Sequence, residues 1–396
     1  MDQSGPRNFA RETVVAGLDA DVIVVGAGLA GLAAATGLSR QGVRVMLVDP
    51  RAHSAPSFKA EKLEASQASL LDVFGLLAPI EPLCGRIRHV VTARGANRLS
   101  TVRMQQWGIP YHDLVNRLRD ALPREVDNRI ARVESLETSA DVQTMRLDDG
   151  QVVRARLVAL AAGVRGKLAQ QMGIGRRMVS ERHSLTAGVT VARADGTDFD
   201  FDALTVYPAG AGRAAYLSFF RIAEGMRVNA FTYYDVESLW ARRFRSEPLA
   251  ALEEAIPGMK RLSGRLVATS KPVLGPIDLW TVDRPERDGV ILVGDAFQSV
   301  CPSTGSGLSK ALTDADVLVH DCVPAWLSTP GMGAAKLERY YQHPRKQAAD
   351  RDSLEAALYR RRITLERSLR LALHRERIFL GMRAAASVAW LMQLFE

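Results

Sequence analysis

The sequence of 396 residues predicts an α/β protein with a doubly wound parallel sheet, an inserted antiparallel sheet and a helical C-terminal region. Three observations predict this class: a strand, glycine turn, helix and strand near the N-terminus, short aromatic-rich strands in the middle of the chain, and helical periodicity at its end. We therefore expect a flexible lead at 1–20, a discontinuous first domain at 21–180 and 268–330, a β-sheet domain at 181–267 and a helical region at 331–396.

Composition narrows the class of protein further. Hydrophobic residues make up 47% of the chain, which is ample for a large core. The net charge of +8 is concentrated near the end, because residues 360–383 hold eight Arg and two Glu, or 8 − 2 = +6. A charge confined to one tail, without a recognisable nucleic-acid-binding module, predicts no nucleic-acid partner.

Targeting and cysteine patterns favour a cytoplasmic protein. The first 20 residues hold no continuous apolar stretch of the kind a secretory signal needs, and no run of about 18 apolar residues marks a membrane span. Cys84, Cys301 and Cys322 form neither a CxxC pair nor a Cys/His spacing. We expect no metal site and a reducing compartment.

The segment DVIVVGAGLAGLAAATGLSRQGVRVMLVDP carries the strongest motif. An apolar strand at 22–25 runs into a GxGxxG turn. A helix follows at 29–40, then a second strand at 43–48, and Asp49 closes that strand. An acid at this place after a GxGxxG turn is typical of a Rossmann-type dinucleotide site.

Each residue of the motif has a physical role in such a site. Gly26 permits the tight turn, and Gly28 lets the backbone approach a pyrophosphate. Gly31 lets the helix pack close to the strand, while the helix N-terminus offers free N–H groups to the anion. Asp49 can accept hydrogen bonds from a ribose hydroxyl. No second GxGxxG motif is present, which suits a protein that holds one dinucleotide permanently.

A second polar turn stands late in the chain, in GDAFQSVCPSTGSGLSKALTDA at 294–315. An apolar strand at 290–293 ends at Gly294-Asp295, and a loop then leads into a helix expected at 308–320. Ligands of doubly wound sheets bind at the carboxyl ends of the strands, so this turn and the first one can converge on one cofactor. Asp295 can bind polyol hydroxyls there, and the helix N-terminus can stabilise negative charge on a ring.

Together these motifs resemble those of FAD-dependent oxidoreductases of the aromatic-hydroxylase superfamily, which includes para-hydroxybenzoate hydroxylase and the ubiquinone-biosynthesis hydroxylases. That family combines an N-terminal GxGxxG ending in an acid with a late GDAxH…P…GxG block, and the resemblance covers most of residues 20–325. It implies that FAD is the cofactor and that the loop at 302–309 lines the isoalloxazine. The cofactor-binding residues so expected are Gly26, Gly28, Leu29, Ala30, Gly31, Asp49, Lys59, Gly163, Gly294, Asp295, Gly305, Gly307, Leu308 and Ser309.

Lys59 enters this set through a third landmark. The family places an Arg that reaches the FAD phosphates or ribose at the start of the segment FKAEKLEASQASLLDVFGLL, and Lys59 stands in that place here. A cation beside a pyrophosphate is favourable. The alternative is a solvated amphipathic helix that carries this lysine by chance.

The resemblance implies flavin monooxygenation. NADPH or NADH reduces FAD, and O2 then gives a flavin hydroperoxide that hydroxylates an aromatic ring or epoxidises an alkene of an isoprenoid or lipid-like small molecule. No catalytic acid or base is identified firmly. Pro302, Gly305 and Gly307 of the flavin loop are the candidates closest to the chemistry. His112, next to Tyr111 at a helix start, is a weaker candidate that competes with an ordinary solvated helix end.

Departures from the family pattern keep other functions open. Ala162-Gly163 replaces an Asp-Gly motif tied to FAD and NAD(P)H binding, Phe297-Gln298 replaces a small residue and His, and Ser309 stands where Asn is common. One alternative is an FAD-dependent reductase or dehydrogenase acting on isoprenoid double bonds. Others are a flavin-dependent halogenase served by a separate reductase, which the partial match WGIP suggests, and a non-catalytic flavin-binding module.

The middle and the end of the chain complete the expectation. Short alternating strands in 181–267 predict an antiparallel sheet that, in the family, covers the flavin and forms the substrate pocket. The candidate lining residues are Tyr207, Tyr216, Phe220, Phe231 and Tyr233. The apolar and Arg-rich stretch 354–395 is either a helical cap on the FAD domain or an interfacial helix in peripheral contact with an anionic membrane.

Overall fold

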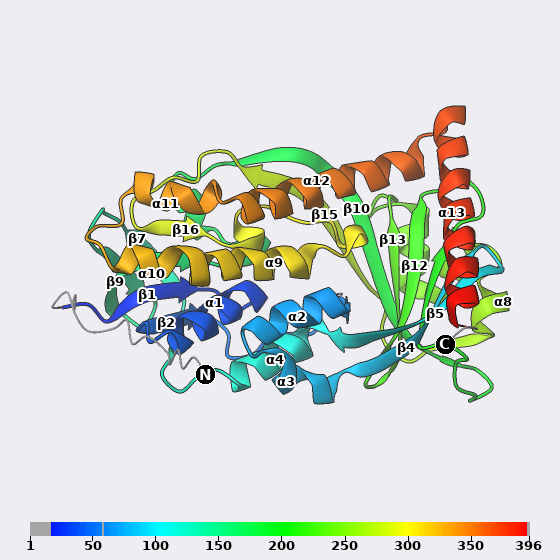
Figure 1. Cartoon of the computed structure of the whole chain (residues 1–396), viewed down its shortest axis with the longest axis horizontal. Coiled ribbons are helices and arrows are strands. Elements are labelled where there is room, and N and C mark those ends of the chain that lie inside the picture. The colour runs from blue at the N-terminus through cyan, green and yellow to red at the C-terminus, as the bar shows by residue number, and fades with distance from the viewer. Residues whose placement is uncertain (1–16, 58, 394–396) are drawn as a thin grey trace.

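The computed structural model describes residues 17–57 and 59–393 and contains two sheets (Figure 1). The first has seven strands in the order β6-β2-β1-β9-β8-β7, with β16 on β9. Strands β6, β2, β1, β9 and β16 run parallel, and β8 and β7 add an antiparallel edge. The bounds are β1 Ala20–Val25, β2 Val45–Asp49, β6 Asp127–Ile130, β7 Val133–Glu137, β8 Gln143–Leu147, β9 Val152–Leu160 and β16 Val290–Leu292.

The second sheet has nine strands in the order β14-β10-β13-β12-β11-β4-β5-β3, with β15 on β10. All its pairs are antiparallel except β4 with β11. The bounds are β3 Ala60–Leu63, β4 Gly85–Arg94, β5 Asn97–Pro110, β10 Arg176–Arg193, β11 Ala203–Tyr207, β12 Ala214–Ile222, β13 Gly225–Thr232, β14 Leu266–Ala268 and β15 Val273–Val282. The expected α/β class with a doubly wound sheet and a second, largely antiparallel sheet is thus confirmed.

The second sheet takes strands from well outside 181–267. β3, β4 and β5 come from residues 60–110, and β15 comes from 273–282. Pairing β4 along β11 covers a hydrogen-bonding edge that strands β10 to β14 alone would leave open. The long strands β10 and β15 run between the two halves of the molecule in Figure 1. The division of the chain into domains by residue range remains a proposal, because both sheets draw on the first 160 residues.

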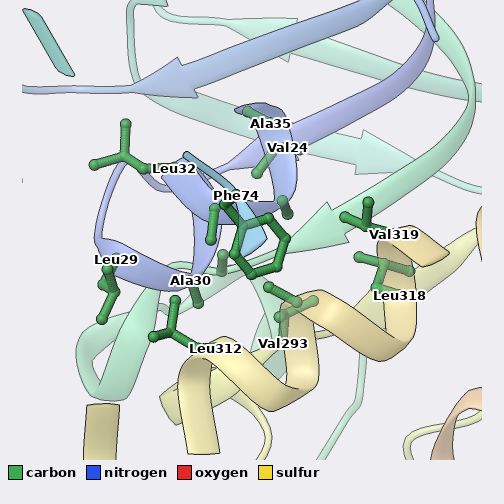
Figure 2. Packing of buried hydrophobic residues seen from close by; sticks show 14 of the residues in the cluster. Val24, Leu29, Ala30, Leu32, Ala35, Phe74, Val293, Leu312, Leu318 and Val319 are labelled. Carbon is green, nitrogen blue, oxygen red and sulfur yellow. The ribbon is translucent and has the colours of Figure 1, made fainter. Parts of the chain in front are cut away.

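The core around the first sheet lies between its parallel strands and the helices α1 and α9. α1 is rich in Ala and Leu, and its residues from Leu29 to Leu38 are buried. Figure 2 shows Leu29 and Ala30 of α1 opposite Leu312 of α9, with Phe74 beside them. The helix expected at 308–320 is α9 followed by a π-helical segment, Val317–Cys322. The helices up to this point are α1 Leu29–Arg40, α2 Ala65–Val73, α3 Leu77–Ile80, α4 Tyr111–Asp120, α5 Leu168–Gln171, α6 Leu239–Ser246, α7 Pro248–Ala255, α8 Lys260–Ser263 and α9 Gly307–Asp316.

The C-terminal region is helical, as expected. It comprises α10 Val323–Leu327, α11 Ala334–Tyr341, α12 Pro344–Leu365 and α13 Leu369–Gln393. α12 crosses the top of the view in Figure 1, and α13 stands at the far end beside the second sheet. Leu354 and Ala357 pack in a cluster with Cys301, so α12 caps the protein. Within the described ranges, no helix has both the length and the apolar character that crossing a bilayer requires. Most of the expected lead, 1–16, lies outside the described residues.

Candidate functional site

In the glycine turn after β1, other atoms lie close to Gly26 and Gly31, while Gly28 has room beside it. Gly26 has φ +106°, and a Cβ there would lie 2.6 Å from the Ala161 carbonyl oxygen. A Cβ on Gly31 would lie 1.9 Å from the Gly26 carbonyl oxygen, so α1 can sit this close only with glycine there. At Gly28 the nearest atom to a Cβ is the Tyr111 hydroxyl at 3.4 Å. The open side at Gly28 is where a phosphate could meet the backbone.

Asp49 braces this turn from the end of β2. Its carboxylate accepts hydrogen bonds from the backbone N–H groups of Ala27 and Arg51, each at 2.9 Å. The buried guanidinium of Arg119 lies 3.5 Å from the same carboxylate and donates to the Ala27 and Arg51 carbonyls. The motif pointed to Asp49. Arg119 was missed, because nothing in its own helix marks it as a partner of a turn some ninety positions earlier.

Side chains from three separate segments gather at the open side of the turn. The Lys59 ammonium lies 3.7 Å from the Asp295 carboxylate and 5.3 Å from the centre of the Tyr111 ring. The Tyr111 hydroxyl accepts a hydrogen bond from the Leu29 N–H at 3.4 Å. Lys59 and Asp295, both expected cofactor contacts, are therefore neighbours, and Tyr111 joins them at the N-terminus of α1.

The protonation states of this cluster follow from its burial and charges. Burial lowers the pKa of Lys59, but Asp295, Tyr111 and Glu61 together more than offset it, so the pKa is raised. Burial raises the pKa of Glu61, although Lys59 opposes the shift. Burial likewise raises the pKa of Tyr111. Lys59 therefore stays charged, and the Tyr111 O–H stays protonated and able to donate to an anion.

The two glycine-rich turns meet because α1 packs on α9. A Cβ on Gly294 would lie 3.2 Å from the Ala30 methyl group, so α1 approaches this turn closely. The turn Gly294–Ala296 also packs against Gly163–Arg165 at the end of β9. At Gly163, with φ +65°, nothing lies within 4 Å of a built Cβ. The turns that follow β1, β9 and β16 therefore lie next to one another.

The loop before α9 is held by side chains on both of its flanks. Gln67 of α2 donates to the Gly305 carbonyl at 3.0 Å and to the Ser309 hydroxyl at 3.1 Å. Tyr216 of β12 donates to the Ser303 carbonyl at 2.9 Å. Gly305 has φ +70° and no neighbour within 4 Å of a built Cβ. Gln67 was missed, and its only sequence signal is its position three residues after Glu64 at a helix start.

These features form a cradle that fits an FAD. Helix α1 begins at Gly28 and helix α9 begins after Ser306, and neither start has a side-chain cap. Backbone N–H groups of both first turns can therefore bind an anion, although that of Leu29 already donates to the Tyr111 hydroxyl. Gly307, Leu308 and Ser309 form the first turn of α9, with Leu308 buried. Pro302 begins the preceding turn.

The aromatic candidates of the second sheet divide into two groups. The Tyr216 ring lies 5.7 Å from that of Tyr207 and 4.7 Å from that of Phe231, and Tyr233 belongs to the same cluster. Phe220 lies in another cluster, against Ile87 and Val90 of β4. The first group is beside the loop at Ser303, and Phe220 is not.

His112 lies apart from the loop. Its Nε2 is 3.4 Å from the Asp113 carboxylate, and its Nδ1 is buried without a hydrogen-bond partner among the described residues. Within the described part of the chain, its side chain pairs with Asp113 and not with the glycine turns. Its proposed role as a base therefore gains no geometric support.

A buried ion network supports the second turn from behind. Lys310 lies 2.8 Å from both Asp314 and Asp350, and Lys346 lies 3.2 Å from Asp314 and 3.1 Å from Asp350. Asp314 also accepts from the Gly294 N–H at 2.8 Å. Burial raises the pKa of Asp314, but the two ammonium groups more than offset it, so the pKa is lowered and the carboxylate stays charged. The network fastens α9, α12 and the turn together.

The residues that depart from the family pattern contact this same helix α12. Gln298 donates to the Asp350 carbonyl at 2.7 Å and contacts the Ser353 hydroxyl at 3.3 Å. The Lys346 ammonium lies 4.1 Å from the centre of the Phe297 ring. Phe297 and Gln298 are therefore used to dock α12, which is a structural reason for the unusual pair.

The fold and the two uncapped helix starts define a dinucleotide-binding oxidoreductase architecture. The family model of the FAD binding domain matches residues 19–351. Kynurenine 3-monooxygenase from Salinispora arenicola is 30% identical over 347 residues, covering 77% of this chain and 72% of that protein. Digeranylgeranylglycerophospholipid reductase 2 from Methanopyrus kandleri is 26% identical over 329 residues, covering 74% of each chain. The solved p-nitrophenol 4-monooxygenase from Pseudomonas putida has a TM-score of 0.73 at 20% identity and 96% coverage of both chains.

The chain belongs to the FAD binding domain family. It is an FAD-dependent oxidoreductase, and the resemblance drawn from the two glycine motifs is confirmed. Its fold is that of the flavoprotein monooxygenases.

Proposed function

We propose that the protein is an FAD-dependent monooxygenase that hydroxylates or epoxidises an aromatic or isoprenoid-like small molecule with O2 and electrons from NADPH or NADH. The observation that carries this proposal is the Tyr216 hydrogen bond to the Ser303 carbonyl. It holds the aromatic face of the second sheet against the loop that enters α9. A substrate resting on this face would therefore lie beside the ring of a cofactor held in the cradle.

The chain would bind FAD with groups from both turns. The N-terminus of α1 at Gly28 would hold the pyrophosphate, Asp49 the ribose, and Lys59 with Asp295 the central part of the cofactor. The N–H groups at the start of α9 would stabilise negative charge on the ring. Bound FAD supplies two-electron transfer and reactivity with O2.

The chain's own contribution is to orient and to exclude water. The aromatic cluster around Tyr216 gives an apolar surface against the loop, and α12 covers its outer side with Arg360 and Arg361 over the Tyr216 and Tyr233 rings. Closing such a site strengthens the electrostatic effect of the α9 N-terminus. No side chain among the described residues is assigned the part of an acid or base.

A reductase is the second candidate, favoured by Ala162-Gly163 in place of Asp-Gly and by the similarity to the Methanopyrus kandleri reductase. The test is to reduce the purified protein anaerobically with NADPH or NADH and follow the flavin absorbance. 18O2 is then admitted with p-nitrophenol, kynurenine or geranylgeraniol. Product that carries 18O supports the monooxygenase, and a saturated product without 18O supports the reductase. Protein that binds no FAD contradicts both.

The same assay addresses the partners. Flavin that both nicotinamides leave oxidised, but that dithionite reduces, indicates a separate reductase and would also suit a halogenase. Co-sedimentation with anionic vesicles tests peripheral membrane contact through 354–395. Leu369, Leu373 and Leu380 of α13 are the exposed apolar side chains that such contact would use.

A further inference from the structure

A cavity of about 390 Å³ lies between the second sheet and the two C-terminal helices. The end of β11, the start of β12 and the loop between them form its floor, and α12 and α13 form its walls. Its apolar lining includes Tyr207, Ile363, Phe379 and Met382. The volume falls within the range of about 300–1,000 Å³ that holds small organic ligands.

The cavity is next to the proposed oxidation site but separate from it. Tyr207 lines it, and the Tyr207 ring lies 5.7 Å from that of Tyr216, whose hydroxyl contacts the loop at Ser303. One layer of aromatic side chains therefore stands between the cavity and the loop. The guanidinium of Arg360, which also lines the cavity, lies 5.3 Å from the centre of the Tyr216 ring.

The charged lining is unbalanced. It consists of Arg94, Arg360, Arg375 and Glu376, or 3 − 1 = +2. Arg94 holds Glu376 in a two-point ion pair. Arg375 donates to the carbonyls of Ile363 and Glu366. Arg94 and Arg375 therefore both have acceptors within the protein.

Arg360 differs from its neighbours. Arg361 donates to the His183 carbonyl, and Arg362 pairs with Glu366 at 3.2 Å. Arg360 forms no ion pair with any described residue, and its Nε is buried without a hydrogen-bond partner there. A buried N–H donor without an acceptor is costly, and a bound anion would give the Nε of Arg360 that acceptor. Its planar donors match a carboxylate or sulfonate in two-point geometry.

We infer that this cavity is a binding site for an amphipathic organic anion, with Arg360 on the anionic group and the apolar walls of α12, α13 and β11 on the body of the molecule. The inference does not depend on which reaction the flavin performs. The ligand is either the substrate, with its anionic group anchored beside Tyr216, or an effector of the neighbouring site.

The test is calorimetric titration of the full-length, FAD-loaded protein with 2-naphthoate and with the uncharged 2-naphthamide, which has nearly the same shape. The expected result is at least about tenfold tighter binding of naphthoate, the contribution of one two-point contact between charged groups. Arg360→Gln should bring the two affinities within about twofold. Arg377→Gln removes an exposed arginine of α13 that does not line the cavity, and it should keep the preference.

A second variant covers a folding failure of Arg360→Gln. Ala372 lines the cavity from α13, and Ala372→Trp should fill it and abolish binding of both probes. Equal affinities in the unaltered protein, or a preference that survives Arg360→Gln, would overturn the inference. If the purified protein cannot be loaded with FAD but still prefers the anion, the inference stands and the proposed function is contradicted. Conversion of naphthoate with NADPH and O2 marks it as a substrate analogue, and binding without conversion marks an effector.

Discussion

Helices α12 and α13 follow each other in the chain and are both basic, yet they are fastened to the protein in opposite ways. The first turn of α12 carries Lys346, whose fully buried ammonium joins Asp314 and Asp350 in the network behind the Gly294 turn. α13 is held through Glu376, which is 54% exposed in its ion pair with Arg94. α12 is thus fixed by buried ion pairs to the Gly294 turn, whereas the ion pair that holds α13 lies at the surface.

The difference shows how burial decides what an ion pair contributes. Breaking a buried pair leaves an uncompensated charge in the core and costs about 3–5 kcal/mol, whereas an exposed pair contributes about 0–1 kcal/mol. We therefore expect changes at the start of α12 to reach the Gly294 turn. Changes in α13 should affect the cavity and leave global stability nearly intact.

Asp314→Asn should give the largest effect. The substitution leaves Lys310 and Lys346 with Asp350 alone and weakens the acceptor of the Gly294 N–H. We expect the free energy of unfolding in urea to fall by about 3–5 kcal/mol. Asp352→Asn, at an exposed carboxylate of α12, serves as the control and should change it by less than about 0.5 kcal/mol. Equal losses of unfolding free energy in the two variants would show that the buried ion pairs contribute no more than exposed ones.

Gly28→Val should weaken FAD binding without changing the stability of the fold, in contrast to Asp314→Asn. Gly28 has φ −84°, which any residue adopts, and a Cβ there meets only the Tyr111 hydroxyl at 3.4 Å. The side chain would instead occupy the space in front of the α1 N-terminus. We expect FAD to bind on the order of 100-fold more weakly, as followed by fluorescence titration, with the melting temperature of the flavin-free protein almost unchanged. Normal flavin content would contradict the cradle.

The pH dependence of stability tests a second anchor of α12. Arg361 donates to the His183 carbonyl, and burial lowers the pKa of the His183 ring from 6.5 to about 4. The unfolded chain then binds more protons than the folded chain between these two pH values. Stability should fall as pH drops through that window, by up to about 1.4 kcal/mol per pH unit.

His183→Asn should flatten this part of the profile, measured by urea unfolding at a series of pH values. His53→Asn, at an exposed histidine, is the matched control and should leave the slope in place. A profile that keeps its slope in His183→Asn would show that another group titrates there.

Glu376→Gln should have the smallest effect on stability. The Arg94 guanidinium holds the pKa of Glu376 below its usual range, so the carboxylate is charged at neutral pH. Its removal should lower the free energy of unfolding by no more than about 1 kcal/mol. Cleavage by trypsin between α12 and α13 should nevertheless become faster, since α13 loses its ion pair with Arg94. Glu355→Gln on the exposed side of α12 should leave cleavage unchanged, and resistance equal in both variants would show that the pair does not hold α13.

Local pattern was enough to predict much of the first half. The helix expected at 29–40 coincides with α1, and the strand expected at 43–48 overlaps β2 at Val45–Asp49. Glycine spacing marked turns that the structure brings close together, although the cofactor role of each residue there remains a proposal. Such features depend on steric limits within a few residues, and those limits are visible in the sequence.

Pairings across long separations were not predictable. Gln67 and the Gly305 carbonyl are 238 positions apart, and Lys310 and Asp350 meet only because α12 lies on α9. The pairing of β4 with β11 likewise depends on which edge the inserted strands leave open. A polar side chain in a helix has the same local signature whether it faces solvent or a buried partner.

By itself the sequence determined the strand, glycine turn and helix that are typical of a dinucleotide site, because glycine alone fits where backbones approach closely. Only the tertiary structure decided that α12 is held by buried ion pairs and α13 by an exposed one. Whether a charged residue is neutralised, exposed or left beside an empty cavity depends on which elements pack around it. That packing is set by the whole chain and not by any one segment of it.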